Sequence, residues 1–174
     1  LRSKARDLDI AEIKSSVIQD LIGSMKKTLR STTDGVGLAA PQVGESLRMF
    51  IVSDEAEEID RAEQKKRTEK KEAISEQGKQ YPIREWNYYV FINPAVISKS
   101  RKKLSGPEGC LSVPGLFGNV SRNEKITVEA RDEQGKKFTR GTSRFFARVI
   151  QHELDHLDGI LFIDKATHLV HVKK

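Results

Sequence analysis

Residues 151–159, Gln-His-Glu-Leu-Asp-His-Leu-Asp-Gly, constrain the fold more than any other stretch of the chain. Two histidines four residues apart fall on one face of an α-helix, where both imidazoles can bind the same metal ion. Between them, Glu153 can act as a general base on a water molecule bound to that ion. His152 and His156 therefore predict a helix that carries two ligands of a metal site and one acid–base group.

The residues around this stretch also favour a helix. Thr142 or Ser143 can cap its beginning and Gly159 can end it, so we expect the helix to run to about Leu157. Four apolar side chains on this helix would pack beside the histidines: Phe145, Phe146, Val149 and Ile150.

The two histidines need a third protein ligand, because catalytic sites of the zinc type have three and leave the fourth position for water or substrate. A third histidine six residues after the second is excluded, since that position is a phenylalanine, and no glutamate follows Glu153. Asp164, His168 and His171 stay open as downstream candidates. Upstream, the lone Cys110 is the strongest candidate, because one thiolate and two imidazoles form an accepted catalytic set. The alternative for Cys110 is a buried, unreactive thiol.

The rest of the chain predicts short strands and one more helix. Apolar residues at helical spacing predict a helix from Asp9 to about Ser31, with Asp9 and Glu12 as a capping box. We expect a constrained loop at residues 106–115, with Cys110 at its centre. Strands are expected at 47–53, at 88–94 with a possible continuation to 98, at 126–130, at 137–139 after a turn at 132–135, and at 160–163. The expected fold class is α+β, with small antiparallel sheets around a central metal-binding helix and the N-terminal helix packed outside.

Length and composition limit the possible domain organisation and partners of the chain. The chain has 174 residues, so we expect a single catalytic domain over residues 1–174. Residues 55–79 carry mixed charge without aromatics, and we expect a mobile, solvated insertion or a short exposed charged helix without catalytic residues. One cysteine indicates a reducing compartment, and we expect no signal peptide and no membrane span. The net charge of +6 favours an acidic partner, or a lysine-rich surface in contact with solvent.

Residues 35–44 contain a glycine pattern that superficially fits a nucleotide site. Gly35, Gly37 and Ala40 match G-x-G-x-x-G/A, but the pattern follows a predicted helix instead of a strand. Pro41 would also remove a backbone donor where the phosphate-binding helix should begin. We therefore expect no nucleotide cofactor. The glycines are better interpreted as a loop that lets the backbone approach a ligand, with Gln42 offering an amide.

Three segments together carry a family resemblance: Gly-Val-Gly-Leu-Ala-Ala-Pro-Gln at 35–42, Glu-Gly-Cys-Leu-Ser at 108–112 and Gln-His-Glu-Leu-Asp-His at 151–156. In this order they closely resemble the three signature motifs of peptide deformylases. The resemblance implies hydrolytic removal of the formyl group from the N-terminal formylmethionine of newly made polypeptides. It also implies that Cys110, His152 and His156 bind one divalent metal ion, with Fe²⁺ as the native ion and Zn²⁺, Ni²⁺ or Co²⁺ as replacements.

The resemblance further implies roles around that ion. A metal-bound water would attack the formyl carbon while Glu153 takes and then donates the proton. The Gln42 side chain and the Leu111 backbone N–H would bind the developing oxyanion. Substrate would contact five more residues: Val36, Gly37, Gly109, Phe145 and Val149.

Two other functions stay open. The same motif suits a metallopeptidase of the H-E-x-x-H type, and the positive charge suits a non-catalytic, metal-stabilised domain that binds the ribosome or RNA. For a deformylase we expect formylmethionyl nascent peptides as substrates, a transient ribosome contact through a surface such as residues 101–103, and no membrane partner. The expected location is the bacterial cytoplasm, with a eukaryotic organelle as the alternative.

Overall fold

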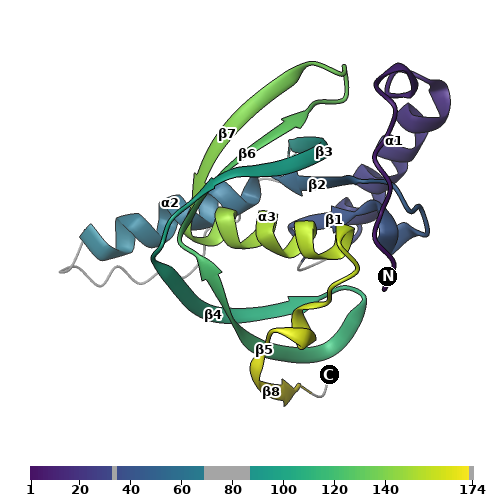
Figure 1. The fold of residues 1–174 in the computed structure, drawn as a ribbon. Helices are drawn as coiled ribbons and strands as arrows, with labels where there is room; N and C mark the ends of the chain where they lie inside the picture. Colours follow the sequence, from purple (N-terminus) through teal and green to yellow (C-terminus); the bar gives the residue numbers. More distant parts are fainter. Residues whose placement is uncertain (33–34, 69–86, 173–174) are drawn as a thin grey trace, which may run out of the picture.

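Two antiparallel sheets pack around one helix, α3 (Arg144–Leu157), in the computed structural model (Figure 1). The model describes residues 1–32, 35–68 and 87–172, with the backbone alone for 63–68. The larger sheet has the order β1 (Gly37–Ala39), β2 (Met49–Ser53), β3 (Tyr88–Lys99), β6 (Lys125–Arg131), β7 (Lys137–Ser143). The smaller sheet has the order β4 (Lys103–Cys110), β5 (Val113–Asn123), β8 (Thr167–His171). The other helices are α1 (Ser16–Arg30), α2 (Glu55–Thr68) and the short 3₁₀ helices η1 (Ile10–Glu12), η2 (Ala40–Val43) and η3 (Phe162–Asp164). The expected α+β class is confirmed.

Strand β2 is buried on both faces, which explains its continuous apolar sequence. Successive side chains of a strand point to opposite faces. Phe50 and Val52 join the hydrophobic cluster that includes the apolar residues of α3. Met49 and Ile51 join the cluster that includes the buried residues of α1. The larger sheet is therefore held between the two helices, and α1 packs on the face away from α3, as expected for the N-terminal helix.

The first helix begins later than its sequence pattern predicts. Asp9 accepts a hydrogen bond from the N–H of Ala11 at 2.9 Å, and it caps only the short η1. Helix α1 starts at Ser16, where the Ser15 side chain accepts from the N–H of Ile18. A serine at this point offers the backbone a cap instead of a continuing helix, so it divides the segment in two.

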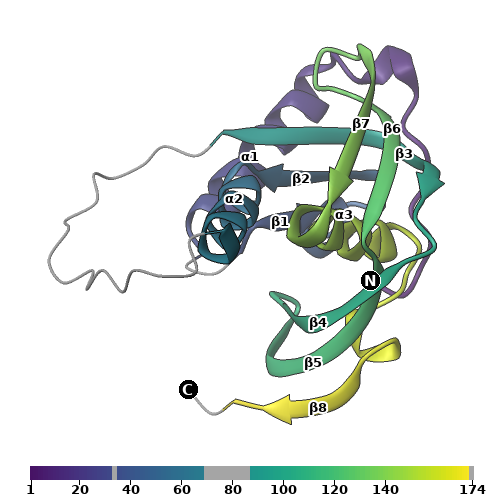
Figure 2. The ribbon, with the colours of Figure 1, turned by 90° about the vertical axis from the view of Figure 1, so that its left-hand side faces the viewer.

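The expected loop at residues 106–115 is wrong, because these residues form the turn end of the β4–β5 hairpin (Figure 2). Pairing continues to Gly109 opposite Phe117, and Cys110 lies opposite Val113 across a tight turn. Pro107 is tolerated because β4 is an end strand of its sheet. At Gly109, a Cβ atom would lie 2.6 Å from the Phe117 ring, so the glycine lets that ring cover the strand.

Two further strand predictions have different outcomes. The possible continuation of the strand beyond Pro94 is confirmed, since β3 runs to Lys99 with an irregular register between Ile92 and Ala95 that accommodates the proline. Residues 160–163 do not form a strand. They lead into η3, where the Asp164 carboxylate accepts from the N–H of Leu161 at 2.9 Å. The hairpin turn at 132–135 is confirmed, and the last strand, β8, contains His168 and His171.

The charged segment is a helix over the part that the structure describes. Residues 55–68 form α2, which confirms the helical alternative for this part. The expectation of full exposure is wrong, because Ala56 is completely buried and Asp60 is only 7% exposed. Residues 69–79 of the predicted insertion lie outside the described residues. Within the described part, no helix has the length and apolar character needed to cross a membrane.

The N-terminal segment crosses the C-terminal end of α3. The N–H of Ala5 donates to the carbonyl of Leu157 at 2.8 Å. Gly159, at a φ of 73°, lies so close to this segment that a Cβ atom would be 2.6 Å from the carbonyl oxygen of Arg2. The predicted stop of the helix at Gly159 therefore also makes room for the beginning of the chain.

Candidate metal centre

Cys110, His152 and His156 lie together as a three-residue group. Their ligand atoms are all within 4.8 Å of one another, and the Cys110 Sγ is 3.2 Å from the His156 Nε2. The two histidines share one face of α3, with ring centroids 4.9 Å apart, as the spacing predicts. The cysteine reaches them from the end of β4. Residues far apart in the sequence thus supply three donors of the types that transition metals prefer.

The other candidates for a third ligand are engaged or placed elsewhere. Asp164 binds the N–H of Leu161 and forms an ion pair with Arg2. His168 and His171 are exposed on β8. Among the described residues, the three-residue group that could hold a metal ion contains Cys110 and none of these three.

The cysteine sulfur is surrounded by hydrogen-bond donors. The N–H of Ser112 donates to Sγ at 3.4 Å, and the Gln42 Nε2 lies 3.6 Å from the same atom. These contacts hold the sulfur in place beside the histidines, and cysteine sulfur is a common ligand of zinc-like metals. The tight turn after β4 brings the Ser112 N–H back to the sulfur, so the hairpin itself fixes the position of the Cys110 side chain.

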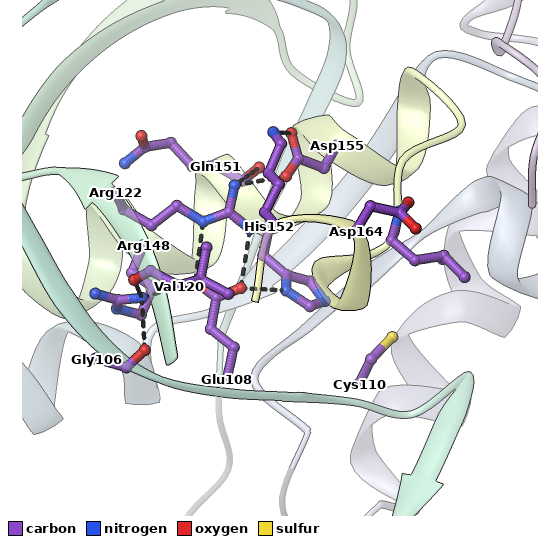
Figure 3. Close-up of polar contacts among 12 residues, drawn as sticks. Gly106, Glu108, Cys110, Val120, Arg122, Arg148, Gln151, His152, Asp155 and Asp164 are labelled. Atoms are coloured by element: carbon purple, nitrogen blue, oxygen red, sulfur yellow. Dashed lines mark hydrogen bonds and ion pairs between the residues drawn. The ribbon is translucent and has the colours of Figure 1, made fainter. Parts of the chain in front are cut away.

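Glu108 orients the imidazole of His152 from the Nδ1 side of the ring (Figure 3). Its Oε2 lies 2.9 Å from the Nδ1 of His152, which leaves Nε2 for the metal group. Arg122 donates two hydrogen bonds to the same carboxylate, at 2.9 and 2.8 Å, and Arg148 donates a third at 2.8 Å. Burial alone would raise the pKa of Glu108, but the bonds from Arg122 and His152 outweigh it and lower that pKa to about 2. The carboxylate is therefore charged and fixes the orientation of the imidazole.

The two arginines tie the smaller sheet to α3. Arg122 on β5 also binds Asp155 at 2.5 Å, and Asp155 in turn binds Lys165 at 2.6 Å. Arg148 donates to three backbone carbonyls of the smaller sheet, those of residues 104, 106 and 120. No motif or periodicity in the sequence points to a role for these residues. The position of Glu108 two residues before the candidate cysteine could have indicated a supporting role near a metal site. Nothing in the sequence distinguishes a buried arginine on a strand from an exposed one.

The protonation of the histidines suits a metal site. Burial lowers the pKa of His156 to about 3, with further lowering by the charges of His152 and Arg122, so its ring is neutral. Burial also disfavours protonated His152, but its bonds to Cys110 and Glu108 outweigh this and raise its pKa to about 10. A cation bound by Cys110, His152 and His156 takes the place of that proton. The donor set, its compactness and the supporting carboxylate thus fit one divalent transition metal ion.

Glu153 lies against the backbone of β1. Its side chain is only 4% exposed, and its Oε2 has no hydrogen-bond partner among the described residues. A Cβ atom on Gly37 would lie 2.5 Å from the Glu153 Oε1, so only glycine leaves room for this carboxylate. Burial raises the pKa of Glu153 to about 7, although the charge of His152 acts in the opposite direction. This carboxyl group can therefore take up and release a proton near neutral pH.

Gln42 is held in one orientation by its own backbone. Its Oε1 accepts from the N–H of Ala39 at 2.8 Å, which directs Nε2 toward the Ser112 Oγ at 3.1 Å and toward the Cys110 sulfur. The expected loop around Gln42 is a short strand followed by η2, with Pro41 in its first turn. Leu111 follows Cys110 in the turn after β4. The structure therefore brings the predicted amide and turn residues to the metal group.

The expected substrate-contact residues lie on two sides of this centre. Val149 is one helical turn before Glu153, and Phe145 is one turn earlier still, so the three share a face of α3. Val36 and Phe145 are half-buried against the hydrophobic cluster that contains Val149. Gly109 lies on the other side, on β4, under the Phe117 ring. The substrate contacts of these residues stay predictions.

Comparison with known proteins gives a consistent family assignment. A family model described as Polypeptide deformylase matches residues 1–171. Peptide deformylase 1A, chloroplastic/mitochondrial, of Arabidopsis thaliana is 39% identical over 165 residues, which cover 95% of this chain and 57% of that relative. The peptide deformylase of Pseudothermotoga lettingae is 38% identical over 165 residues, which cover 94% of this chain and 75% of that relative. This chain thus spans little more than half the length of the Arabidopsis relative.

Solved structures agree with this assignment. The Met-Ala-Ser-bound class I type b peptide deformylase of Acinetobacter baumannii has a TM-score of 0.72 and 33% identity, covering 94% of this chain and 90% of that chain. The peptide deformylase of Synechococcus elongatus in complex with actinonin has a TM-score of 0.71 and 30% identity, covering 97% and 74%. The fold, the grouped metal donors and these similarities lead to one conclusion: the chain belongs to the peptide deformylase family of enzymes.

Proposed function

We propose that this protein removes the formyl group from the N-terminal formylmethionine of newly made polypeptides. The observation that carries the proposal is the compact group of Cys110, His152 and His156, with the Gln42 amide in contact with the thiol. Relatives that share the fold are named peptide deformylases, and one of them is described with a bound Met-Ala-Ser peptide. We propose the same class of substrate here, and one catalytic domain over residues 1–174.

Cys110, His152 and His156 would hold one divalent cation. When bound, such a cation acts as a Lewis acid and lowers the pKa of a coordinated water molecule. Glu108 keeps the His152 ring in place through its bond to Nδ1. We propose Fe²⁺ as the native ion and Zn²⁺, Ni²⁺ or Co²⁺ as functional replacements, because this ligand set accepts all four.

Glu153 would carry the proton during hydrolysis. Its raised pKa, about 7, lets it accept a proton from the attacking water and return it to the amine that leaves. The position of Glu153 against Gly37 keeps water from surrounding the carboxylate. General acid–base catalysis of this kind contributes about 10²- to 10⁴-fold to a rate.

Two donors would stabilise the oxyanion that forms from the formyl oxygen. The Gln42 Nε2 is fixed by the bond that its Oε1 accepts from Ala39, and the Leu111 N–H lies directly after the cysteine. One such donor is worth about 3 kcal/mol in comparable sites. We propose that Val36, Phe145 and Val149 contact the methionine side chain, and that the glycines at 37 and 109 let the peptide approach closely.

Formate release tests the proposal. The metal-loaded chain should release formate from formyl-Met-Ala-Ser and leave the acetylated and unblocked peptides unchanged. Cleavage of internal peptide bonds without formate would show a metallopeptidase instead. Glu153→Gln should abolish turnover while the protein keeps its metal, because the residue moves protons and is not one of the three proposed ligands.

Metal analysis distinguishes a catalytic site from a closed structural one. Cys110→Ala should lose the metal, whereas Asp164→Ala should retain it, because Asp164 binds Leu161 and Arg2 instead. Equal loss from both variants would indicate a structural site with four protein ligands. A transient ribosome contact through residues 101–103 and a bacterial or organellar location stay predictions, supported by the exposure of that segment and by the sources of the relatives.

A further inference from the structure

Helix α3 receives its N-terminal cap from a distant segment. The first N–H groups of a helix need outside partners, and a serine at the N-cap position commonly supplies one. Here Ser143 occupies that position but makes no capping bond with its side chain. Asp60 of α2 takes over this role, because its two carboxylate oxygens accept from the N–H groups of Phe145 and Phe146, both at 2.9 Å. A buried carboxylate at this end also complements the helix dipole.

Helix α2 is anchored so that Asp60 stays in place. Its Ala56 is fully buried, and Glu57, one turn before Asp60, forms an ion pair with Arg140 and accepts from the Tyr89 hydroxyl at 3.3 Å. The Arg140 guanidinium lies over the Tyr89 ring at 3.8 Å from its centroid. Both ribbon views place α2 beside the beginning of α3 (Figures 1 and 2). The cap is therefore held by contacts with two strands of the larger sheet.

The cap acts on the part of α3 that faces the proposed methionine site. Phe145 is held through its own N–H, and Val149 is the next residue on the same face. His152 is seven residues beyond Phe145, about 10 Å along the helix axis. That part of the helix is fixed independently by Glu108 and its arginine partners. Loss of the cap should therefore loosen the first turn without moving the metal ligands.

We propose that Asp60 is a positioning residue for substrate: through the first turn of α3 it orders Phe145, and thereby the surface that receives the methionine side chain. This inference rests on the function proposed above. Asp60 touches neither the metal ligands nor, by this inference, the substrate. It should therefore affect KM and leave kcat nearly unchanged.

Steady-state kinetics on the metal-loaded full chain tests the inference. Asp60→Ala should raise KM for formyl-Met-Ala-Ser about five-fold, the factor that corresponds to a typical helix cap of about 1 kcal/mol. Both kcat and metal content should stay within about two-fold. Asp60→Asn should give a smaller rise, because its amide keeps one acceptor oxygen. The matched control is Glu55→Gln, which removes a carboxylate from the same helix and leaves both capping bonds and the Glu57–Arg140 ion pair in place, so KM should stay near its original value.

Amide hydrogen exchange gives a measure that does not depend on activity. In Asp60→Ala the amides of Phe145 and Phe146 should exchange at least about five-fold faster, while the amide of His156 should keep its protection. If the alanine variant does not fold, the asparagine variant should show faster exchange at one of these two amides. Unchanged exchange and unchanged KM, or a joint fall of kcat and metal content, would overturn the inference. Absence of formate release by the unmodified chain would instead refute the proposed function and leave the exchange result valid.

Discussion

Gly37→Ala is the most direct test of how tightly Glu153, the proposed acid–base group, is held. Gly37 lies in β1, and a Cβ atom added there would be 2.5 Å from the Glu153 Oε1, 3.0 Å from Cδ and 3.1 Å from Cγ. Carbon atoms in contact prefer a separation of about 3.5–4.0 Å, so the carboxylate would have to withdraw by about 1 Å. Glu153 is only 4% exposed and cannot turn into solvent to avoid the new methyl group.

The expected loss follows from that displacement. A misplacement of about 1 Å can reduce a rate about 10²-fold. We expect Gly37→Ala to lower kcat for formate release by about 10- to 100-fold, which corresponds to about 1.4–2.7 kcal/mol in activation free energy. The metal content should stay unchanged, because the three atoms nearest to the new methyl group all belong to Glu153, which is not one of the proposed ligands.

The assay compares formate release and bound metal in the unmodified chain, in Gly37→Ala and in Gly23→Ala. Gly23 is a matched control because a Cβ atom there meets nothing within 4 Å. In helix α1 this change should leave turnover unaltered and raise stability by about 1 kcal/mol. Turnover of Gly37→Ala within about two-fold of the unmodified chain would refute the reasoning, and so would a loss of metal that accounts for the loss of rate.

Three further variants test other parts of the structure. Arg144 has a φ of 54°, and one of its guanidinium nitrogens is buried without a partner among the described residues. Arg144→Gly should therefore raise the free energy of unfolding, measured by urea denaturation, by about 1 kcal/mol. A decrease in this free energy would show that the arginine stabilises the turn. Glu108→Gln should weaken metal retention against a chelator about 10- to 100-fold and lower the free energy of unfolding by about 3 kcal/mol, because the buried arginines lose their charged partner. The pKa of Glu108 falls from 4.5 to about 2 on folding, so the stabilisation by its charge is complete above pH 4.5 and is lost as the pH falls toward 2. The difference in free energy of unfolding between the unmodified chain and Glu108→Gln should therefore narrow over that pH range. A constant difference would contradict the lowered pKa of Glu108. Gly159→Ala should destabilise the fold by at least about 1 kcal/mol, because Gly159 has a φ of 73° and the new methyl group would overlap with the carbonyl of Arg2. An unchanged midpoint of thermal unfolding would contradict this close contact.

The features that the sequence predicts well are local ones. His152 and His156 share a helix face and Glu153 directly follows His152, so helical periodicity alone arranges them. The turn before β7 follows from Gly135, whose φ of 79° suits glycine. Even the candidate cysteine could be inferred, because the chain offers few donors of the right type.

The features that it misses depend on pairing between distant segments. The Cys110 segment has the glycines and prolines of a loop, yet it is a strand because its edge position tolerates Pro107 and the Phe117 ring covers Gly109. Asp60 was assigned to a solvated segment, although it caps a helix more than eighty residues away. A capping side chain from another element produces no periodic pattern in the sequence, and the charged composition around Asp60 indicated exposure to solvent instead of burial.

The crossing of the N-terminal segment over the end of α3 bears on how the protein matures during synthesis. Chains emerge from the N-terminus and generally fold in that order. Ala5 nevertheless finds its partner only at Leu157, and the sulfur of Cys110 can meet both histidines only one residue earlier, once His156 has been made. Ala5 therefore stays unpaired at this contact until residue 157 has been translated. The candidate metal group and the contact that joins the N-terminal segment to α3 thus become possible at almost the same point of synthesis.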